Sequence, residues 1–425
     1  MNLIETDSHY VWHPYTQMQT APDPVGIVRG EGAYLYGEDG TKYFDAVASW
    51  WVNLHGNSHP YIAKKVCEQL RTLEHAMFAG FTHPPAAELA ARLLQVLPSQ
   101  QGKIFYSDDG STAVEVAVKM AMQYWYNGGT PRNRLIAFKN AYHGDTFGAM
   151  SVSGRSSFTT PFSPLLFDVD FIDAPVNGKE AAAEEQLRYL LSERKNEIAA
   201  FIFEPLVQGT AGMVMHEPAS LDRLLAICKD QGILTIADEV MTGFGRTGKL
   251  FACDHLTLQP DIFCFSKGIT GGTMSFGATT CTQGVYDAFL SGDKMKTFFH
   301  GHSFTANPLA CAASLASLDL LLQEETMQCI RRISSQHQAF ADSIREHPRV
   351  REVRCRGTII AMEWDTGADS SYFSSLRDQL YDFFLKKGII LRPLGNISYI
   401  MPPYCSSEED LEMTYGAIRL ALDRF

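Results

Sequence analysis

The chain has 425 residues, of which 45% are hydrophobic and 20% are charged. This composition supplies a large apolar core and excludes a disordered or fibrous protein. The 36 Lys and Arg residues against 48 Asp and Glu residues give a formal net charge of −12, and no run of basic residues occurs. Nucleic acid is therefore not an expected partner.

The nine cysteines are scattered and never stand in a CxxC spacing. This pattern argues against a disulfide framework and against a cysteine-based zinc site. The N-terminal segment carries Glu5 and Asp7 where a signal peptide has a basic stretch followed by an apolar run. Since there is also no stretch of about 18 uncharged apolar residues, we expect a protein of the reducing cytoplasm.

The predicted elements begin with a hairpin, whose strands at residues 33–36 and 42–45 flank an EDG turn at residues 38–40. Further along, short β-branched or aromatic runs alternate with longer segments of helical periodicity. The expected strands are residues 103–107, 134–139, 200–204, 233–238, 262–266 and 277–282, and the expected helices include residues 112–126, 180–196 and 218–231. This alternation predicts a large α/β domain with a mostly parallel sheet wrapped by helices.

The end of the chain has a different pattern. A long amphipathic helix at residues 327–346 leads into residues 350–363, a helix at residues 372–387, and short strands at residues 389–391 and 398–401. We expect both chain ends to join in one small α+β domain. The predicted division places residues 1–54 and 326–425 in the small domain and residues 55–325 in the large domain.

Chemistry-bearing residues follow several of the predicted strands. Residues 107–112 (SDDGST) form a polar glycine turn before a helix, and such a helix N-terminus suits a phosphate, although the same residues also suit an ordinary cap. Asp238 closes an apolar strand, where an open α/β sheet binds ligands and where a buried charge needs a cationic partner. A helix cap or a structural ion pair is the alternative for this residue.

Two further residues lie at the same predicted edge. Lys267 follows the aromatic strand 262–266, where burial would lower the pKa of its amine and make the neutral amine available as a nucleophile. The alternative for this residue is a solvated loop lysine. Tyr142 lies just after strand 134–139, and its ring can lie flat on a planar ligand or belong to the core. Pyridoxal phosphate would use all four features: a lysine for its aldehyde, a carboxylate for its ring nitrogen, an anion site and a flat surface.

Residues 238–248 (DEVMTGFGRTG), followed by Pro260-Asp261 and Ser266-Lys267, resemble the signature of the class III, or ω-type, aminotransferases. The similarity extends to Glu204-Pro205 with Gly209 and to residues 307–310 (NPLA). It implies a pyridoxal-phosphate enzyme of fold-type I, which is a homodimer with active sites shared between subunits.

The chain ends are similar to one branch of this family, which acts in biotin biosynthesis. The matching segments are residues 11–16 (VWHPYT), 49–51 (SWW), 141–150 (AYHGDTFGAM), 391–395 (LRPLG) and 399–404 (YIMPPY). The implied reaction moves the amino group of S-adenosylmethionine to the cofactor and then to 8-amino-7-oxononanoate. Two dissimilar small molecules would use one site in turn.

The resemblance also implies residue roles. Asp238 and Lys267 would act as described above, with Tyr142 as a third catalytic residue that covers the ring. Gly110 and Ser111 would hold the phosphate. The substrate pocket would be lined by Tyr15, Trp50 and Tyr399, with Arg392 on a substrate carboxylate. Core positions for Trp50 and Trp51 and a structural ion pair for Arg392 stay open.

One segment departs from the family pattern. Where the family usually has Gly-Pro-Thr before a phenylalanine, this chain has Gly301, His302 and Ser303. Gly301 is expected at the substrate, and His302 and Ser303 at the cofactor phosphate of the neighbouring subunit, where serine keeps the hydroxyl donor. His300 and His302 lack a third ligand, so no metal site is expected.

Two alternatives remain at this stage. The first is another class III aminotransferase with an ω-amino acid, ornithine or polyamine donor, or a biotin-branch enzyme that uses lysine. The second is a nucleotide-binding or regulatory protein without catalysis. Against the second, residues 209–212 (GTAG) lack the spacing of a dinucleotide fingerprint, and no GKS or GKT phosphate loop occurs.

Overall fold

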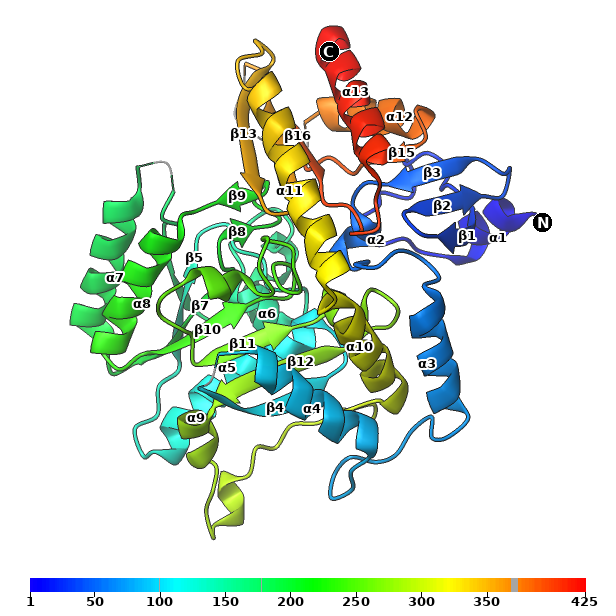
Figure 1. The fold of residues 1–425 in the computed structure, drawn as a ribbon. Coiled ribbons are helices and arrows are strands. Elements are labelled where there is room, and N and C mark those ends of the chain that lie inside the picture. The colour runs from blue at the N-terminus through cyan, green and yellow to red at the C-terminus, as the bar shows by residue number, and fades with distance from the viewer. Residues whose placement is uncertain (99, 177, 368–373) are drawn as a thin grey trace.

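The computed structural model describes residues 1–425 except residues 99, 177 and 368–373. At its centre is a seven-stranded sheet in the order β4-β12-β11-β10-β7-β5-β6 (Figure 1). β12 runs antiparallel to both of its neighbours, β11 and β4, and the other strand pairs described in this sheet are parallel. The expected α/β class with a mostly parallel sheet is therefore confirmed. The strands are β4 (Gln101–Ser107), β5 (Arg134–Phe138), β6 (Val169–Ile172), β7 (Ile198–Phe203), β10 (Leu234–Asp238), β11 (Ile262–Phe265) and β12 (Gly277–Thr282).

Six of these strands lie within two residues of their predicted positions, and β6 is the one that the sequence analysis missed. β6 has only four residues, is half-buried, and carries Asp170. The Asp170 carboxylate pairs with Arg134 of β5 at 3.0 Å. A short edge strand with a charged side chain lacks the continuous apolar run that marks a central strand, which explains the miss.

The central strands are apolar because helices cover both faces of the sheet. Every residue of β7 is buried, and from Ala200 onward successive residues belong to two different cores. Phe201 and Phe203 pack on one face, whereas Ala200 and Ile202 pack on the other, towards helix α5 (Gly110–Asn127). Burial of such a large side chain stabilises the fold by roughly 1.5–3 kcal/mol. Strand β7 thus contributes to both cores.

Helices surround this sheet (Figure 1). The predicted helices at residues 112–126, 180–196 and 218–231 are confirmed as α5, α7 and α8. The helix α5 begins with a capping box, in which the Asp109 side chain accepts from the backbone N–H of Thr112. The helices are α3 (Pro60–Leu70), α4 (Pro84–Val96), α5 (Gly110–Asn127), α6 (Phe147–Val152), α7 (Glu180–Arg194), α8 (Pro218–Asp230), α9 (Gln283–Asp287) and α10 (Pro308–Leu321), with 3-10 turns η1 (Thr160–Leu165), η2 (Ala252–His255), η3 (Lys267–Thr270) and η4 (Lys294–Lys296) and a small hairpin of β8 (Val207–Gln208) and β9 (Val214–Met215).

The two chain ends meet in a four-stranded sheet. After α1 (Leu3–Tyr10), the strands β1 (Ile27–Glu31), β2 (Tyr34–Gly37) and β3 (Lys42–Asp45) form an antiparallel meander, which contains the expected hairpin. Strand β15 (Ile389–Ile390) adds parallel to β3, with Ile389 opposite Phe44. This pairing favours the small domain built from both ends, while its exact boundaries at residues 54 and 325 stay a prediction.

The C-terminal part adds a second small sheet. Helix α11 (Glu324–Ile344) leads to β13 (Val350–Arg356) and β14 (Ile359–Trp364), which pair antiparallel, and β14 pairs with β16 (Ile397–Ile400). Helix α12 (Leu376–Lys386) corresponds to the predicted helix 372–387, whose first two residues lie outside the described ones. The last helix, α13 (Glu408–Arg424), was not predicted.

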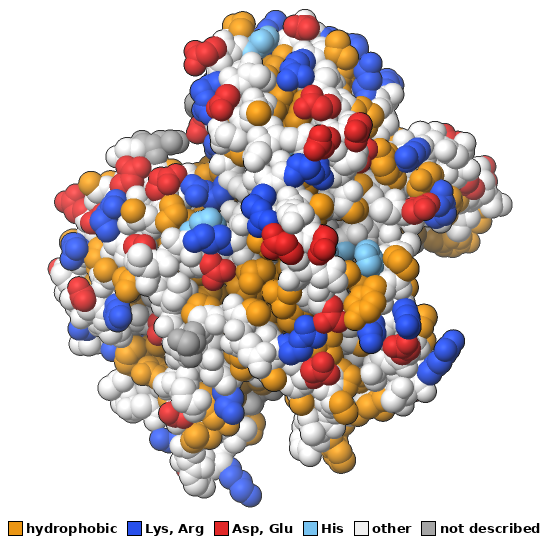
Figure 2. Space-filling view, viewed as in Figure 1, with side chains coloured by type: hydrophobic (Ala, Val, Ile, Leu, Met, Phe, Trp, Pro, Cys, Tyr) orange, Lys and Arg blue, Asp and Glu red, His pale blue; other side chains and the backbone are white. Residues whose placement is uncertain are grey.

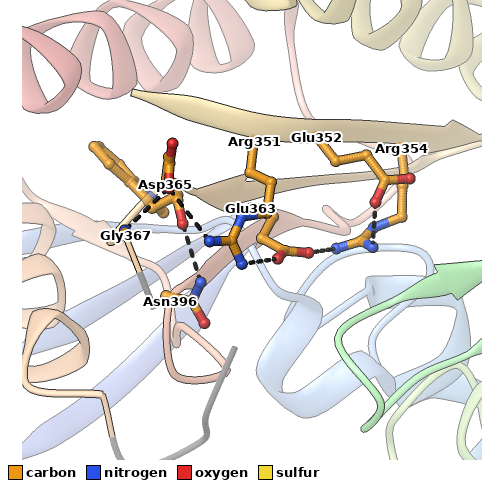
Figure 3. A network of polar contacts seen from close by, with 8 residues as sticks. Arg351, Glu352, Arg354, Glu363, Asp365, Gly367 and Asn396 are labelled. Carbon is orange, nitrogen blue, oxygen red and sulfur yellow. Dashed lines mark hydrogen bonds and ion pairs between the residues drawn. The ribbon is translucent and has the colours of Figure 1, made fainter. Parts of the chain in front are cut away.

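Charged side chains tie β13 to β14 (Figure 3). Glu363 of β14 lies between two arginines of β13, with Oε2 2.8 Å from Arg354 and Oε1 3.3 Å from Arg351. Arg354 also pairs with Glu352 at 2.9 Å, and Arg351 with Asp365 at 3.3 Å. Because Arg354 and Glu363 are nearly buried, this network fixes the register of the strand pair that carries β16.

The surface has no dominant sign of charge on the face seen in Figure 2, where Lys and Arg side chains lie among Asp and Glu side chains. Within the described part of the chain, no helix is long and apolar enough to cross a bilayer.

Candidate active site

A cavity of about 910 Å³ opens where β5, β7, β10 and β11 end. Ligands of open α/β sheets bind at this edge. Nine of the twelve residues named from the sequence line the cavity, and the other three belong to the loop 301–303 outside it. The nine are Tyr15, Trp50, Gly110, Ser111, Tyr142, Asp238, Lys267, Arg392 and Tyr399.

Asp238 lies at the end of β10, with 5% of its surface exposed. Its Oδ2 lies 2.7 Å from Nδ1 of His143, and its Oδ1 accepts a hydrogen bond of 3.0 Å from the backbone N–H of Val240. Such partners offset the cost of removing a carboxylate from water. His143, to which the sequence analysis gave no role, is thus the side-chain partner of Asp238, whereas the expectation of a cationic partner stays a prediction. Among the described residues, nothing bonds to Nε2 of His143.

Lys267 lies two residues beyond the end of β11, after Ser266, and begins the turn η3 with a backbone φ of 47°. Burial lowers the pKa of its amine to about 8, although the carboxylates of Asp238 and Glu204 act in the opposite direction. Its Nζ lies 4.5 Å from the centroid of the Trp51 ring. An amine with this pKa is partly neutral near pH 8, so it can act as a nucleophile and as a base.

Glu204, which the sequence analysis quoted without a role, also lines the cavity. It is buried, and its two carboxylate oxygens accept hydrogen bonds of 3.0 Å from the backbone N–H groups of Tyr142 and Gly209. Burial raises the pKa of Glu204 to about 7. This side chain anchors the loop of Tyr142 to the end of β7.

The predicted anion site is the first turn of α5. The Asp109 side chain caps Thr112, and Gly110 and Ser111 follow as the first helical residues. The N–H groups of a first helical turn have no acceptors within the helix, and the helix dipole adds positive potential there. Both residues face the cavity, so this turn can bind a phosphate group.

Two tyrosines and a carboxylate line one part of the cavity. The Tyr142 hydroxyl donates to Oδ2 of Asp145 at 3.0 Å, and the Tyr15 hydroxyl donates to the same oxygen. Burial, with Tyr15 and Asp145 nearby, raises the pKa of the Tyr142 hydroxyl, so this group stays protonated. The Tyr15 ring lies 5.8 Å from the Trp50 ring in an edge contact.

The tryptophan pair belongs to an unusual turn. In α2 (Ala48–Trp51), four successive residues have positive φ values of 49°, 48°, 74° and 73°. This left-handed backbone places the two rings on different sides: Trp50 is 41% exposed at the cavity, whereas Trp51 is 4% exposed above Lys267. L-residues rarely adopt this conformation in succession, so other groups must hold it.

Arg246 holds that turn, and the sequence analysis assigned it no role. Its guanidinium is buried and donates to three backbone carbonyls: Pro402 at 2.8 Å, Asn53 at 2.9 Å and Trp51 at 3.3 Å. Within the described residues it contacts no carboxylate directly, although Asp45 contributes a charge nearby. Arg246 belongs to the DEVMTGFGRTG segment, but its hydrogen-bond partners lie up to 195 residues away in the sequence. The segment by itself therefore could not show which groups this side chain contacts.

Arg392 and Tyr399 complete the pocket from the C-terminal part. The Arg392 guanidinium lies 4.4 Å from the centroid of the Trp50 ring, a cation–π contact at the cavity. Tyr399 of β16 is buried, and its hydroxyl accepts a hydrogen bond of 3.0 Å from Nε1 of Trp51. The N-terminal turn and the C-terminal strand are therefore joined at the site.

The loop of Gly301, His302 and Ser303 lies outside the cavity of its own chain. Nδ1 of His302 lies 2.9 Å from Oδ2 of Asp108, which precedes the phosphate-binding turn. The His302 ring also lies 5.0 Å from the ring of His300. Among the described residues, no group of three or more His, Cys, Asp or Glu side chains could hold a metal ion.

Comparison with known proteins assigns the chain and its fold to a family. Residues 15–422 match the family described as "Aminotransferase class-III". The chain is 46% identical over 424 residues to the adenosylmethionine-8-amino-7-oxononanoate aminotransferase of Synechococcus elongatus, covering 97% of this chain and 98% of that protein. It is 40% identical to the enzyme of the same name from Geobacter sulfurreducens, covering 99% and 97%.

Solved structures support membership of the same family. The crystal structure of adenosylmethionine-8-amino-7-oxononanoate aminotransferase from Methanocaldococcus jannaschii superimposes with a TM-score of 0.95 at 35% identity, covering 99% of this chain and 98% of that one. A PLP-bound amine transaminase from an uncultivated Pseudomonas species gives a TM-score of 0.92 at 31% identity, covering 98% of both. The chain belongs to the class III aminotransferase family and is an enzyme.

Proposed function

We propose that this enzyme transfers an amino group from S-adenosylmethionine to 8-amino-7-oxononanoate, a step of biotin biosynthesis, with pyridoxal phosphate as cofactor. The observation that carries the proposal is one cavity that holds Asp238 and Lys267 beside Tyr15, Trp50 and Arg392. The first two residues suit any member of the family, and the other three suit a large substrate that carries a carboxylate. The names of the relatives in Synechococcus and Geobacter support the same reaction.

The groups that line the cavity fit pyridoxal phosphate. The first turn of α5 suits the phosphate, a buried carboxylate with a histidine behind it suits a protonated ring nitrogen, and an amine with a pKa of about 8 suits the aldehyde. A flat aromatic side chain, Tyr142, lines the same space. The family and the PLP-bound relative support this cofactor.

The residues of this chain then have distinct tasks. When bound, pyridoxal phosphate supplies an aldehyde for the amine and a ring that withdraws electrons from the substrate carbon. Asp238 holds a proton at the ring nitrogen, and His143 keeps the carboxylate oriented. Lys267 would move a proton between the substrate carbon and the cofactor carbon. Gly110 and Ser111 bind the phosphate.

The pocket beyond the cofactor has to accept two substrates in turn. Arg392 binds a substrate carboxylate through its planar guanidinium, which both substrates can use. Tyr15, Trp50 and Tyr399 offer apolar surface with polar edges, which suits a seven-carbon chain as well as an adenosyl group. The wide cavity of about 910 Å³ is consistent with such dissimilar molecules.

The site is completed by a second copy of the chain. We place Gly301 of one subunit at the substrate, and His302 and Ser303 at the phosphate in the partner, because this loop lies outside the cavity of its own chain. A homodimer with shared active sites follows. Sedimentation analysis should give twice the chain mass of 47.3 kDa, and a monomer that binds cofactor and turns over would contradict this arrangement. A location in the cytoplasm stays a prediction.

A donor assay tests the function. Purified enzyme should convert 8-amino-7-oxononanoate to the diamine with S-adenosylmethionine, and Lys267→Ala should form no product and no band that borohydride removes. Solved transaminases with TM-scores of 0.91 to 0.93 and identities of 26 to 31% share this fold, so donor choice is decided by the pocket. Transfer from β-alanine, ornithine, putrescine or lysine, with none from S-adenosylmethionine, would reject the proposed donor.

A further inference from the structure

The loop that carries Tyr142 is held from one side by helix α5. Ser111 and Glu115 are four residues apart on this helix, so they lie on the same face. The backbone N–H of Asp145 donates to Oγ of Ser111 at 3.2 Å. One turn further along, Glu115 reaches the same loop. Helix α5 therefore contacts the loop at two points separated by one helical turn.

The contact through Glu115 contains more hydrogen bonds than the contact through Ser111. Oε1 of Glu115 accepts three hydrogen bonds: 2.5 Å from the Thr146 hydroxyl, 2.7 Å from the backbone N–H of Gly148 and 3.1 Å from that of Ala149. These N–H groups open helix α6 (Phe147–Val152), whose own N-cap, Thr146, makes no side-chain cap bond. A carboxylate from another helix thus satisfies the first turn of α6.

Two glycines make this approach possible. A Cβ at Gly144 would lie 2.1 Å from Oγ of Ser111, and a Cβ at Gly148 would lie 2.1 Å from Oε2 of Glu115. The spacing of four residues on the loop matches the spacing of four on α5. The loop could not lie against the helix with larger residues at these positions unless one of them moved.

We propose that Glu115 is a positioning residue that, together with Ser111, fixes residues 142–149 so that Tyr142 faces the cofactor site. Glu204 anchors the start of this loop through the N–H of Tyr142, and Glu115 anchors its end. The hydroxyl of Tyr142 reaches Asp145 within the segment between the two anchors. The role rests on the proposed function only for its catalytic consequence, because the anchoring itself is a property of the protein without substrate.

Hydrogen–deuterium exchange of the protein without cofactor tests the anchoring. In Glu115→Ala, the amides of Gly148 and Ala149 should exchange at least about tenfold faster than in the wild type, because each loses its acceptor. Glu115→Gln, which keeps the volume but loses the charge, should give an intermediate rate. Peptides from β7 should be unchanged in both variants. Glu193→Gln, an exposed glutamate of α7, is the control for loss of one charge and should match the wild type.

Kinetics test the consequence. If Glu115 acts through Tyr142, then Glu115→Gln combined with Tyr142→Phe should lower kcat/KM by much less than the product of the two separate effects. Pyridoxal phosphate should also bind the Glu115→Gln protein several-fold more weakly. Unchanged exchange of residues 146–149 in both Glu115 variants would overturn the proposal, as would strictly multiplicative effects with Tyr142→Phe. A protein without transaminase activity would reject the proposed function while the exchange measurement still decides the role of Glu115.

Discussion

The left-handed turn at Ala48–Trp51 gives the sharpest test of how the site is built. Its four residues with positive φ cost roughly 1–2 kcal/mol each, so the turn stores about 4–8 kcal/mol. Arg246 donates one hydrogen bond to a carbonyl of the turn, that of Trp51, and two more to the carbonyls of Asn53 and Pro402 outside it. A charged donor contributes roughly 1.5–3 kcal/mol per bond, or about 5–9 kcal/mol for the three together. The two quantities are comparable, so the turn should relax when the guanidinium is removed.

Arg246→Met fills the buried space but leaves the carbonyls of Trp51, Asn53 and Pro402 without that donor. We expect kcat/KM to fall by about 100-fold with both substrates, because a displacement of about 1 Å at the site has an effect of this size. The free energy of unfolding should fall by about 3 kcal/mol, since unsatisfied acceptors cost roughly 1–3 kcal/mol each and relief of the turn offsets part of that. In Arg246→Lys, both kcat/KM and the free energy of unfolding should lie between the wild-type and Arg246→Met values, because a lysine ammonium lacks the planar guanidinium.

Three measurements check this prediction: steady-state kinetics with each substrate, urea unfolding, and near-ultraviolet circular dichroism, which reports the packing of tryptophans. Arg223→Met is the matched control, since Arg223 is an exposed arginine that pairs with Glu184 on the surface. It should behave as the wild type. An Arg246→Met protein with wild-type kinetics and an unchanged near-ultraviolet spectrum would show that the turn holds its shape without the guanidinium.

Four further predictions follow from the site. Asp238→Asn should fold and bind pyridoxal phosphate but lose most turnover, because an amide cannot hold the ring proton; near-normal kcat would contradict the assignment. Arg392→Ala should raise KM for both carboxylate-bearing substrates by about tenfold or more, and an unchanged KM would make this residue structural. Because burial lowers the pKa of Lys267 to about 8 from 10.5, the unfolded chain binds a proton between these values that the folded chain lacks. The free energy of unfolding of the cofactor-free protein should therefore rise with pH in that window, and urea titrations of Lys267→Met should not show this contribution. His302→Pro removes the contact with Asp108 and should alter cofactor affinity in a fluorescence titration, whereas Asn substitution at the exposed Asp168 should not.

The central sheet was predictable because its strands are marked locally. A strand such as β7, buried on both faces, has to be a short apolar run, and the residue that ends it has to lie at the ligand edge. For this reason Asp238, Lys267 and Tyr142 could be placed near one another from the sequence. The half-exposed edge strand β6 lacks such a continuous apolar run.

Some features depend on partners that are distant in the sequence. His143 and Asp238 are 95 residues apart, Trp51 and Tyr399 are 348 apart, and β3 pairs with β15 from the other end of the chain. Hydrophobic periodicity reports that a side chain is buried, but not which group it meets.

The sequence alone thus determined the α/β class, the strands that end at the site, and the acid and lysine at their ends, because each is encoded in a few neighbouring residues. Only the tertiary structure decided the left-handed turn of Trp50 and Trp51, its support by Arg246, and the anchoring of the Tyr142 loop by Glu115. Those arrangements exist because backbone carbonyls and N–H groups that are buried far from their own elements must still find hydrogen-bond partners.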